Sequence, residues 1–87
     1  MTRVTLLTRP DCGLCDHAKA VLAAVNRDHL LDVEEVSVDS HEGRRLATGA
    51  GVLFAPGILL DGQPFGYGRL SERKLRKALR QRSPASS

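Results

Sequence analysis

Two cysteines three positions apart, Cys12 and Cys15, stand between an apolar segment and a stretch of helical periodicity. Residues 4–8, which include Val4, Leu6 and Leu7, predict a buried strand, and the turn-forming Pro10 lies just beyond its end. From residue 12 to about residue 26, apolar residues recur at helical spacing, which predicts a helix that packs one face on a sheet. This spacing puts both sulfurs on one side of the first helical turn, close enough to bond each other. The sequence therefore predicts a reactive cysteine pair at a helix N-terminus.

Three further strands are predicted along the chain. Residues 33–38 alternate in the manner of a half-buried strand, which completes a strand–helix–strand unit. At this length the two strands of the unit are expected to be parallel, with a right-handed crossover. Residues 58–60 and 65–67 predict an antiparallel hairpin joined by residues 61–64.

Two more helices complete the pattern. Asp39, followed three residues later by Glu42, resembles a capping box and is expected to open a short helix, which Gly49 and Gly51 end. Ser71 is the expected N-cap of the last helix. The predicted order is βαβ-α-ββα, an α/β fold.

The length of 87 residues supports one domain with a modest core. We expect this domain to cover residues 1–82 and a flexible tail to cover residues 83–87. No apolar run approaches the roughly 20 residues that span a membrane, and residues 1–4 enter a strand pattern without a secretory signal. The expected compartment is therefore the cytoplasm, where paired cysteines are more often catalytic or metal-binding than structural.

The formal net charge is +3, and its excess is concentrated near one end. Between Arg69 and Arg82 there are seven Lys or Arg residues and one acid, Glu72. Such a cluster could bind nucleic acid or an acidic partner, or it could be a solvated helix face with cations near its C-terminus. We favour the solvated face, because no aromatic residue is interleaved with the charges to stack on bases. No nucleic-acid or membrane partner is predicted.

The chemistry expected of the cysteine pair is disulfide exchange, which needs an attacking thiolate and a leaving thiol. Free N–H groups at the helix N-terminus favour a thiolate at Cys12, and such positions lower the pKa of a thiol. The positive charge of Arg9 also favours a thiolate, whereas the negative charges of Asp11 and Asp16 disfavour it. The sequence does not give the sum of these opposing effects on the pKa of Cys12. Cys15 lies further into the helix and is expected to resolve the mixed disulfide. This cycle needs neither a metal nor a cofactor held in the protein.

Metal binding is the alternative use of the same two cysteines. A zinc site needs four ligands, and the further candidates are His17, His29 and His41, each expected at the surface. A copper-carrying domain also places two such cysteines after a first strand, and soft thiolates suit Cu(I). Against it, the predicted fold ends in a helix, and no methionine other than Met1 precedes the pair. The alternative function is a module that carries Cu(I) or holds an iron–sulfur cluster with glutathione.

Three separated segments resemble glutaredoxin-like members of the thioredoxin-fold superfamily, which include glutaredoxins and NrdH redoxins. They are TRPDCGLC at residues 8–15, GVLFAPGI at residues 51–58 and GQPFGYG at residues 62–68. Together they place most of the chain, residues 4–79, within the resemblance. It implies a thioredoxin-like, four-stranded mixed sheet in the order 2-1-3-4 with helices on both faces.

The resemblance also implies roles for individual residues. Cys12 would be the nucleophile and Cys15 the resolving cysteine, supported by Arg9 and Pro10. Pro56 would be cis and lie beside the cysteines, an isomer found in only ~5–6% of X-Pro bonds.

Substrate contacts are implied as well, with one departure from the family. The backbone of Ala55 would pair with an extended substrate or with glutathione. Gly68, Arg69 and Leu70 stand where glutaredoxins follow a glycine turn with a small residue and an Asp that holds the amino end of glutathione. An anion could still rest on the last helix with the help of Arg69.

The predicted function is thiol–disulfide oxidoreductase, reducing protein or small-molecule disulfides. Glutathione, as a co-substrate, or a flavoprotein of the thioredoxin-reductase type would restore the dithiol. We expect no bound cofactor and a monomer.

Overall fold

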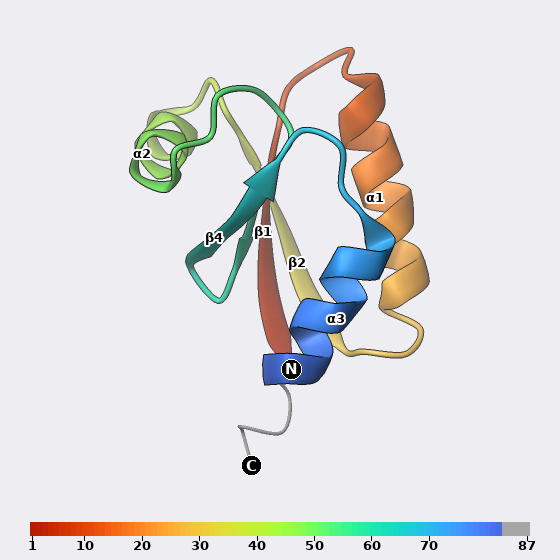
Figure 1. Cartoon of the computed structure of the whole chain (residues 1–87). Coiled ribbons are helices and arrows are strands. Elements are labelled where there is room, and N and C mark those ends of the chain that lie inside the picture. The colour runs from red at the N-terminus through yellow and green to blue at the C-terminus, as the bar shows by residue number, and fades with distance from the viewer. Residues whose placement is uncertain (83–87) are drawn as a thin grey trace.

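The computed structural model describes residues 1–82, so the expected flexible tail at residues 83–87 lies outside the described residues. The described chain forms a sheet with helices packed around it (Figure 1). In order, its elements are β1 (Thr2–Thr8), α1 (Gly13–Val25), β2 (Leu31–Ser37), α2 (His41–Ala50), β3 (Gly57–Leu60), β4 (Gln63–Tyr67) and α3 (Glu72–Arg82).

The sheet has the strand order β2-β1-β3-β4, which confirms the predicted order 2-1-3-4. β1 runs parallel to β2 and antiparallel to β3, and β3 pairs antiparallel with β4. β1 is central, and its residues Val4, Thr5, Leu6 and Leu7 are all buried. Burial on both faces explains why this stretch is apolar except for Thr5.

The hydrophobic core lies between the sheet and the pair α1 and α3, which cover the same face (Figure 1). Val4 and Leu6 of β1 point into this core. Its buried members are Val4, Leu6, Ala18, Val21, Leu22, Val25, Leu31, Ile58, Leu60, Leu70, Leu75 and Leu79. None of the helices within residues 1–82 has the length and apolar character needed to cross a membrane.

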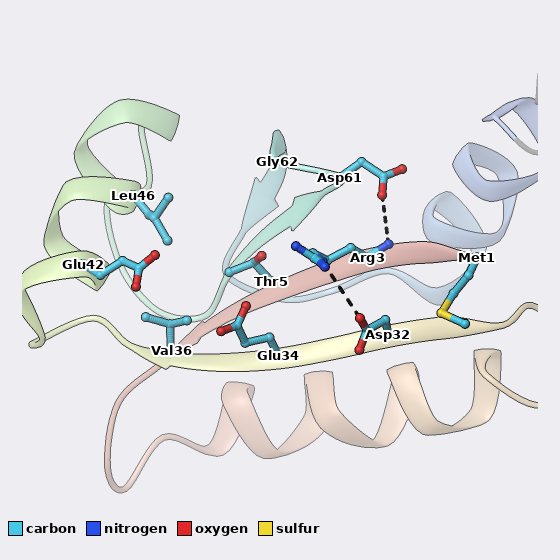
Figure 2. A pocket seen from close by; sticks show the side chains of 10 residues that line it. All are labelled: Met1, Arg3, Thr5, Asp32, Glu34, Val36, Glu42, Leu46, Asp61 and Gly62. Atoms are coloured by element: carbon cyan, nitrogen blue, oxygen red, sulfur yellow. Dashed lines mark hydrogen bonds and ion pairs between the residues drawn. The ribbon is translucent and has the colours of Figure 1, made fainter.

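The opposite face of the sheet is covered by α2 only in part. Figure 2 shows the resulting hollow, of about 590 Å³, where Glu42 and Leu46 of α2 face Thr5 and Val36 of the sheet. Its other lining residues are Met1, Arg3, Asp32, Glu34, Asp61 and Gly62. None of these ten residues belongs to the loop that carries the cysteines, so this hollow is separate from the predicted site.

The start of α2 differs from the prediction by one residue. Ser40, not Asp39, is the N-cap, and its Oγ accepts a hydrogen bond of 2.9 Å from the backbone N–H of Gly43. The same hydroxyl donates to the carbonyl of Ser37 at 2.7 Å, while the backbone N–H of Asp39 donates to the Ser37 hydroxyl at 3.1 Å. The hydrogen bonds of Ser37 with Asp39 and Ser40 hold the turn before α2. As a result, the helix begins one residue later than the capping-box pattern predicted.

The end of α2 confirms one of the two expected glycines. Gly51 has φ of 71° and forms the left-handed C-cap, a conformation that glycine adopts without steric cost. Gly49 lies within the helix and does not end it, so the prediction for that residue was wrong.

The hairpin and β2 have different bounds from those predicted. Asp61 and Gly62 both have positive φ, of 50° and 82°, and form a two-residue turn rather than a four-residue connection. β2 begins two residues earlier than expected, at Leu31, whose N–H donates to the Asn26 side chain at 2.8 Å. Leu31 is a core residue, so its burial extends the strand.

The last helix begins as predicted, and one of its cations has a structural partner. The Ser71 hydroxyl accepts a hydrogen bond of 3.2 Å from the backbone N–H of Lys74. The Arg76 guanidinium binds Asp28 at 2.7 Å and Glu72 at 2.9 Å, and these carboxylates raise the pKa of Arg76 above its usual value. Asp28 lies in the turn after α1, so this side chain ties α3 to the rest of the domain.

A pair of alanine substitutions in α2 tests its close contact with the end of β2. Gly43 is buried, and a Cβ there would overlap the backbone carbonyl of Ser37, whereas a Cβ at Gly49 meets nothing within 4 Å. Gly43→Ala should lower the free energy of unfolding by roughly 1–3 kcal/mol. The control Gly49→Ala should raise it by about 0.5–1 kcal/mol, because alanine favours helix over glycine. Urea unfolding measures both, and equal effects would contradict the close contact.

Candidate active site

Cys12 and Cys15 are joined by a disulfide at the N-terminus of α1. Cys12 is the N-cap, with an extended backbone, and Cys15 lies in the first helical turn. Their Cα atoms are 5.2 Å apart, a separation ordinary for disulfides. The expectation that the sulfurs can bond each other is therefore confirmed.

The chain reaches this position through a sharp turn after β1. Asp11 has φ of 53°, a left-handed conformation that Asp tolerates better than most residues. Pro10 precedes it with a fixed φ, so the turn is built from two residues suited to it. The turn brings Cys12 to the helix start, directly beyond the end of the central strand.

The sulfur of Cys12 caps the helix. The backbone N–H of Cys15 donates to Cys12 Sγ at 3.1 Å, and the Cys12 carbonyl accepts from the N–H groups of Cys15 and Asp16, both at 3.1 Å. When the disulfide is reduced, the same N–H group and the positive end of the helix dipole stabilise negative charge on this sulfur. The geometry therefore supports thiolate chemistry at Cys12.

The two cysteines differ in exposure. Cys15 is 2% exposed and packs within the domain, whereas Cys12 is half-buried. An external molecule therefore meets Cys12 first. The expected order of attack, Cys12 before Cys15, stays a prediction at this point.

The residues around Cys12 form a hollow of about 640 Å³. Arg9, Pro10 and Ala55, all expected near the pair, line it together with Cys12. Asp11, Gly13, Leu14 and Asp39 complete the lining. The structure thus brings two of the predicted supporting residues, Arg9 and Pro10, and the predicted substrate-binding residue Ala55 to the more exposed of the two cysteines.

The loop before β3 contributes a cis proline to this end of the sheet. The Ala55–Pro56 peptide bond is cis, as the resemblance implied, and Pro56 is buried. The Pro56 carbonyl accepts a hydrogen bond of 2.8 Å from the N–H of Gly68, which links the loop to the segment leading into α3. Gly68 has φ of 81° and is buried, so a glycine suits this junction.

Two predicted ligand-binding residues lie elsewhere. Arg69 and Leu70 line a separate hollow of about 320 Å³ between α1 and the start of α3. Leu70 belongs to the hydrophobic core and is 3% exposed, so its side chain offers little surface to a ligand. The binding role predicted for Leu70 from its position along the chain stays a prediction, and its side chain is part of the core.

His17 lies in the same hollow as Arg69 and is half-buried, not at the surface as expected. Its Nδ1 is buried and has no hydrogen-bond partner among the described residues. Within residues 1–82, no three His, Cys, Asp or Glu side chains gather in a way that could hold a metal ion. A metal bound at the cysteine pair would therefore have the two thiolates as its ligands from this part of the chain.

Sequence reasoning missed a second hollow, of about 370 Å³, that adjoins the Cys12 hollow. The two share Arg9 and Ala55. Its other lining residues are Val38, Arg44, Ala47, Thr48, Val52, Leu53 and Phe54. The apolar run at residues 52–54 was the available signal, but its exposure depends on contacts that the sequence pattern does not reveal.

Comparisons with known proteins identify both the fold and the family. The family model described as Glutaredoxin-like domain (DUF836) matches residues 3–80. A mutant thioredoxin from Halobacterium salinarum has a TM-score of 0.70 and 23% sequence identity, over 92% of this chain and 73% of that one. Oxidised mitochondrial thioredoxin 3 from Saccharomyces cerevisiae has a TM-score of 0.68 and 22% identity, over 92% of this chain and 77% of that one. A search of curated proteins finds no match.

At these identities the two thioredoxins establish the fold alone, which is the predicted α/β thioredoxin fold. The family model, in contrast, spans nearly the whole chain and confirms the resemblance carried by the three segments. The match to this family, together with the cysteine pair at the start of α1, supports a redox enzyme in general terms. The chain belongs to the glutaredoxin-like domain family.

Proposed function

We propose that the protein is a thiol–disulfide oxidoreductase that works through both cysteines. The observation that carries this proposal is the unequal pair at the start of α1. Cys12 is half-buried with its sulfur at the helix cap, and Cys15 is buried behind it. A helix N-terminus activates the first sulfur, and the short distance between the two lets the second complete the exchange.

The reaction begins with the reduced pair. The Cys12 thiolate attacks one sulfur of the substrate disulfide, which forms a mixed disulfide and releases the other substrate sulfur as a thiolate that takes a proton from solvent. Cys15 then loses its proton and attacks Cys12 Sγ. This second attack forms the Cys12–Cys15 disulfide and releases the first substrate sulfur as a thiol. Two electrons pass from the protein to the substrate.

An external donor must return these two electrons. Two molecules of glutathione or a flavoprotein reductase would supply them, and no cofactor held by the protein is required. Arg69 and Leu70 provide no carboxylate at the place where glutaredoxins hold the amino group of glutathione, which favours the flavoprotein. We place this reaction in the cytoplasm and assign it to the monomer.

Serine variants of the two cysteines test the mechanism. With dithiothreitol as donor and insulin as substrate, Cys12→Ser should lower the reduction rate to that of dithiothreitol alone, because the attacking sulfur is gone. Cys15→Ser, reduced and then freed of dithiothreitol before insulin is added, should accumulate a mixed disulfide with insulin at Cys12, visible as an added mass under non-reducing conditions. Circular dichroism controls for folding. If Cys15→Ser, freed of dithiothreitol, releases reduced insulin as completely as the wild-type protein does, Cys15 loses its proposed role.

A coupled assay run with two donors tests how the dithiol is restored. We expect NADPH oxidation to be faster with thioredoxin reductase than with glutathione and glutathione reductase, because the contact for the glutathione amino group is missing. The Cys12→Ser variant is the blank in each arm. Faster turnover in the glutathione arm would assign the protein to the glutathione pathway instead.

A further inference from the structure

We propose that the second hollow selects the substrate: it binds an aliphatic side chain next to the substrate cysteine, in a protein segment that also carries a carboxylate. This hollow, named here the side hollow, is the one of about 370 Å³ lined by Leu53, Phe54 and Arg44. The proposal rests on the proposed disulfide exchange at Cys12 and names the class of substrate for it.

The side hollow is continuous with the place where the substrate cysteine must lie. A substrate sulfur bonded to Cys12 occupies the first hollow, and Arg9 and Ala55 line both hollows. Neighbouring residues of an extended segment are about 3.3 Å apart along the chain, so a residue close to the substrate cysteine reaches the side hollow. The two hollows can therefore bind neighbouring residues of the same substrate segment.

Apolar surface is exposed at this end of the molecule. Among residues 1–82, the large apolar side chains that are exposed include Leu53 at 76% and Phe54 at 54%. Leu14, which lines the first hollow, and Tyr67 are also exposed, at 37% and 39%. Contiguous exposed apolar surface is uncommon on small soluble proteins and marks binding sites. An aliphatic side chain from a substrate would cover it.

One wall of the side hollow is held in place before any substrate arrives. The Phe54 ring packs edge-on against Tyr67, with ring centroids 5.0 Å apart and an interplanar angle of 85°. Gly68 leaves room for this ring, since a Cβ there would lie 3.0 Å from Phe54 Cε1. A preformed wall lowers the entropy lost on binding.

Charge determines the second feature of the substrate. Arg9 and Arg44 line the side hollow, and no Asp or Glu does. Arg9 and Arg44 are both exposed residues, and neither makes an ion pair with another residue among positions 1–82. A substrate carboxylate beside the aliphatic residue would meet complementary charge, while a lysine would be repelled. Glutathione has carboxylates but no aliphatic side chain, so it matches the charges and leaves the apolar wall uncovered.

Peptides with a single cysteine, linked by a disulfide to 5-thio-2-nitrobenzoate, test the proposal. Attack of Cys12 on the peptide sulfur releases the coloured thiolate, and Cys15 then frees the peptide. The peptides carry Leu or Ser beside the cysteine, on either side in turn, and Glu or Lys one residue further. The fully reduced protein should react roughly tenfold faster with the best Leu–Glu peptide than with its Ser–Glu counterpart, as expected for partial burial of a leucine.

Two matched pairs of variants assign the preference to the side hollow. Leu53→Glu should bring the ratio of Leu-peptide to Ser-peptide rates close to one, while Leu30→Glu should leave the ratio unchanged. Leu30 is 72% exposed and belongs to neither hollow. Arg44→Glu should reverse the preference for Glu over Lys. Its neighbour Arg45, which pairs with Glu42 at 3.9 Å and is not in the side hollow, provides the control Arg45→Glu.

The outcomes separate this proposal from the function on which it rests. If no peptide and no small disulfide is reduced, the proposed oxidoreductase function fails. If all peptides are reduced at one rate, or if Leu53→Glu keeps the wild-type ratio, the function stands and the selection by the side hollow is overturned. Faster reduction of glutathione linked to the same nitrobenzoate than of every Leu peptide would also overturn it, with glutathione as the preferred occupant.

Discussion

The hydrogen bond from the Cys15 backbone to Cys12 Sγ joins structure and chemistry in one contact. Helix starts leave N–H groups without partners, and a Ser, Thr, Asp or Asn side chain ordinarily accepts from one of them. Here a sulfur takes that place, so the group that caps the helix is also the group that reacts. The cap fixes the sulfur at the positive end of the helix dipole and aligns Cys15 behind it. Exposure, order of attack and the surrounding hollow all depend on this position.

Strand topology explains why the cis proline lies near that cap. A parallel pair needs a crossover, so α1 must start where β1 ends, and Cys12 follows β1 closely. β3 runs antiparallel to β1 and pairs Gly57 with Leu7, so its first residue also lies at the end of β1. The Ala55–Pro56 bond directly precedes that residue. Two segments far apart in sequence are thus brought to one edge of the sheet by pairing with the same central strand.

The sequence predicted the elements whose local pattern determines them. Helical periodicity after Cys12 predicted α1, the apolar residues among positions 4–8 predicted β1, and Ser71 predicted the start of α3. Each of these patterns depends on neighbouring residues. Errors arose where distant contacts decide. His17 was expected at the surface, but it is half-buried in a hollow beside the start of α3. The ligand-binding role of Leu70 stays a prediction, and the core between α1 and α3 buries its side chain. The side hollow escaped prediction for the same reason, because α2 and the loop before β3 form it together only in the folded chain.

The outer strand of the sheet has a consequence for how copies of the chain meet. β2 pairs with β1 on one side, and within residues 1–82 no strand pairs with its other side. Asp32, Glu34 and Glu35 are exposed along it. Arg3 lies 3.9 Å from Asp32 and Lys19 lies 3.4 Å from Glu35, so two of the three carboxylates have a cationic partner. Unpaired backbone of this kind invites stacking into extended aggregates, and like charges along it resist that process. We therefore expect the carboxylates of β2 to disfavour pairing of this edge strand with a second copy of the chain. This effect is independent of the chemistry of the two cysteines.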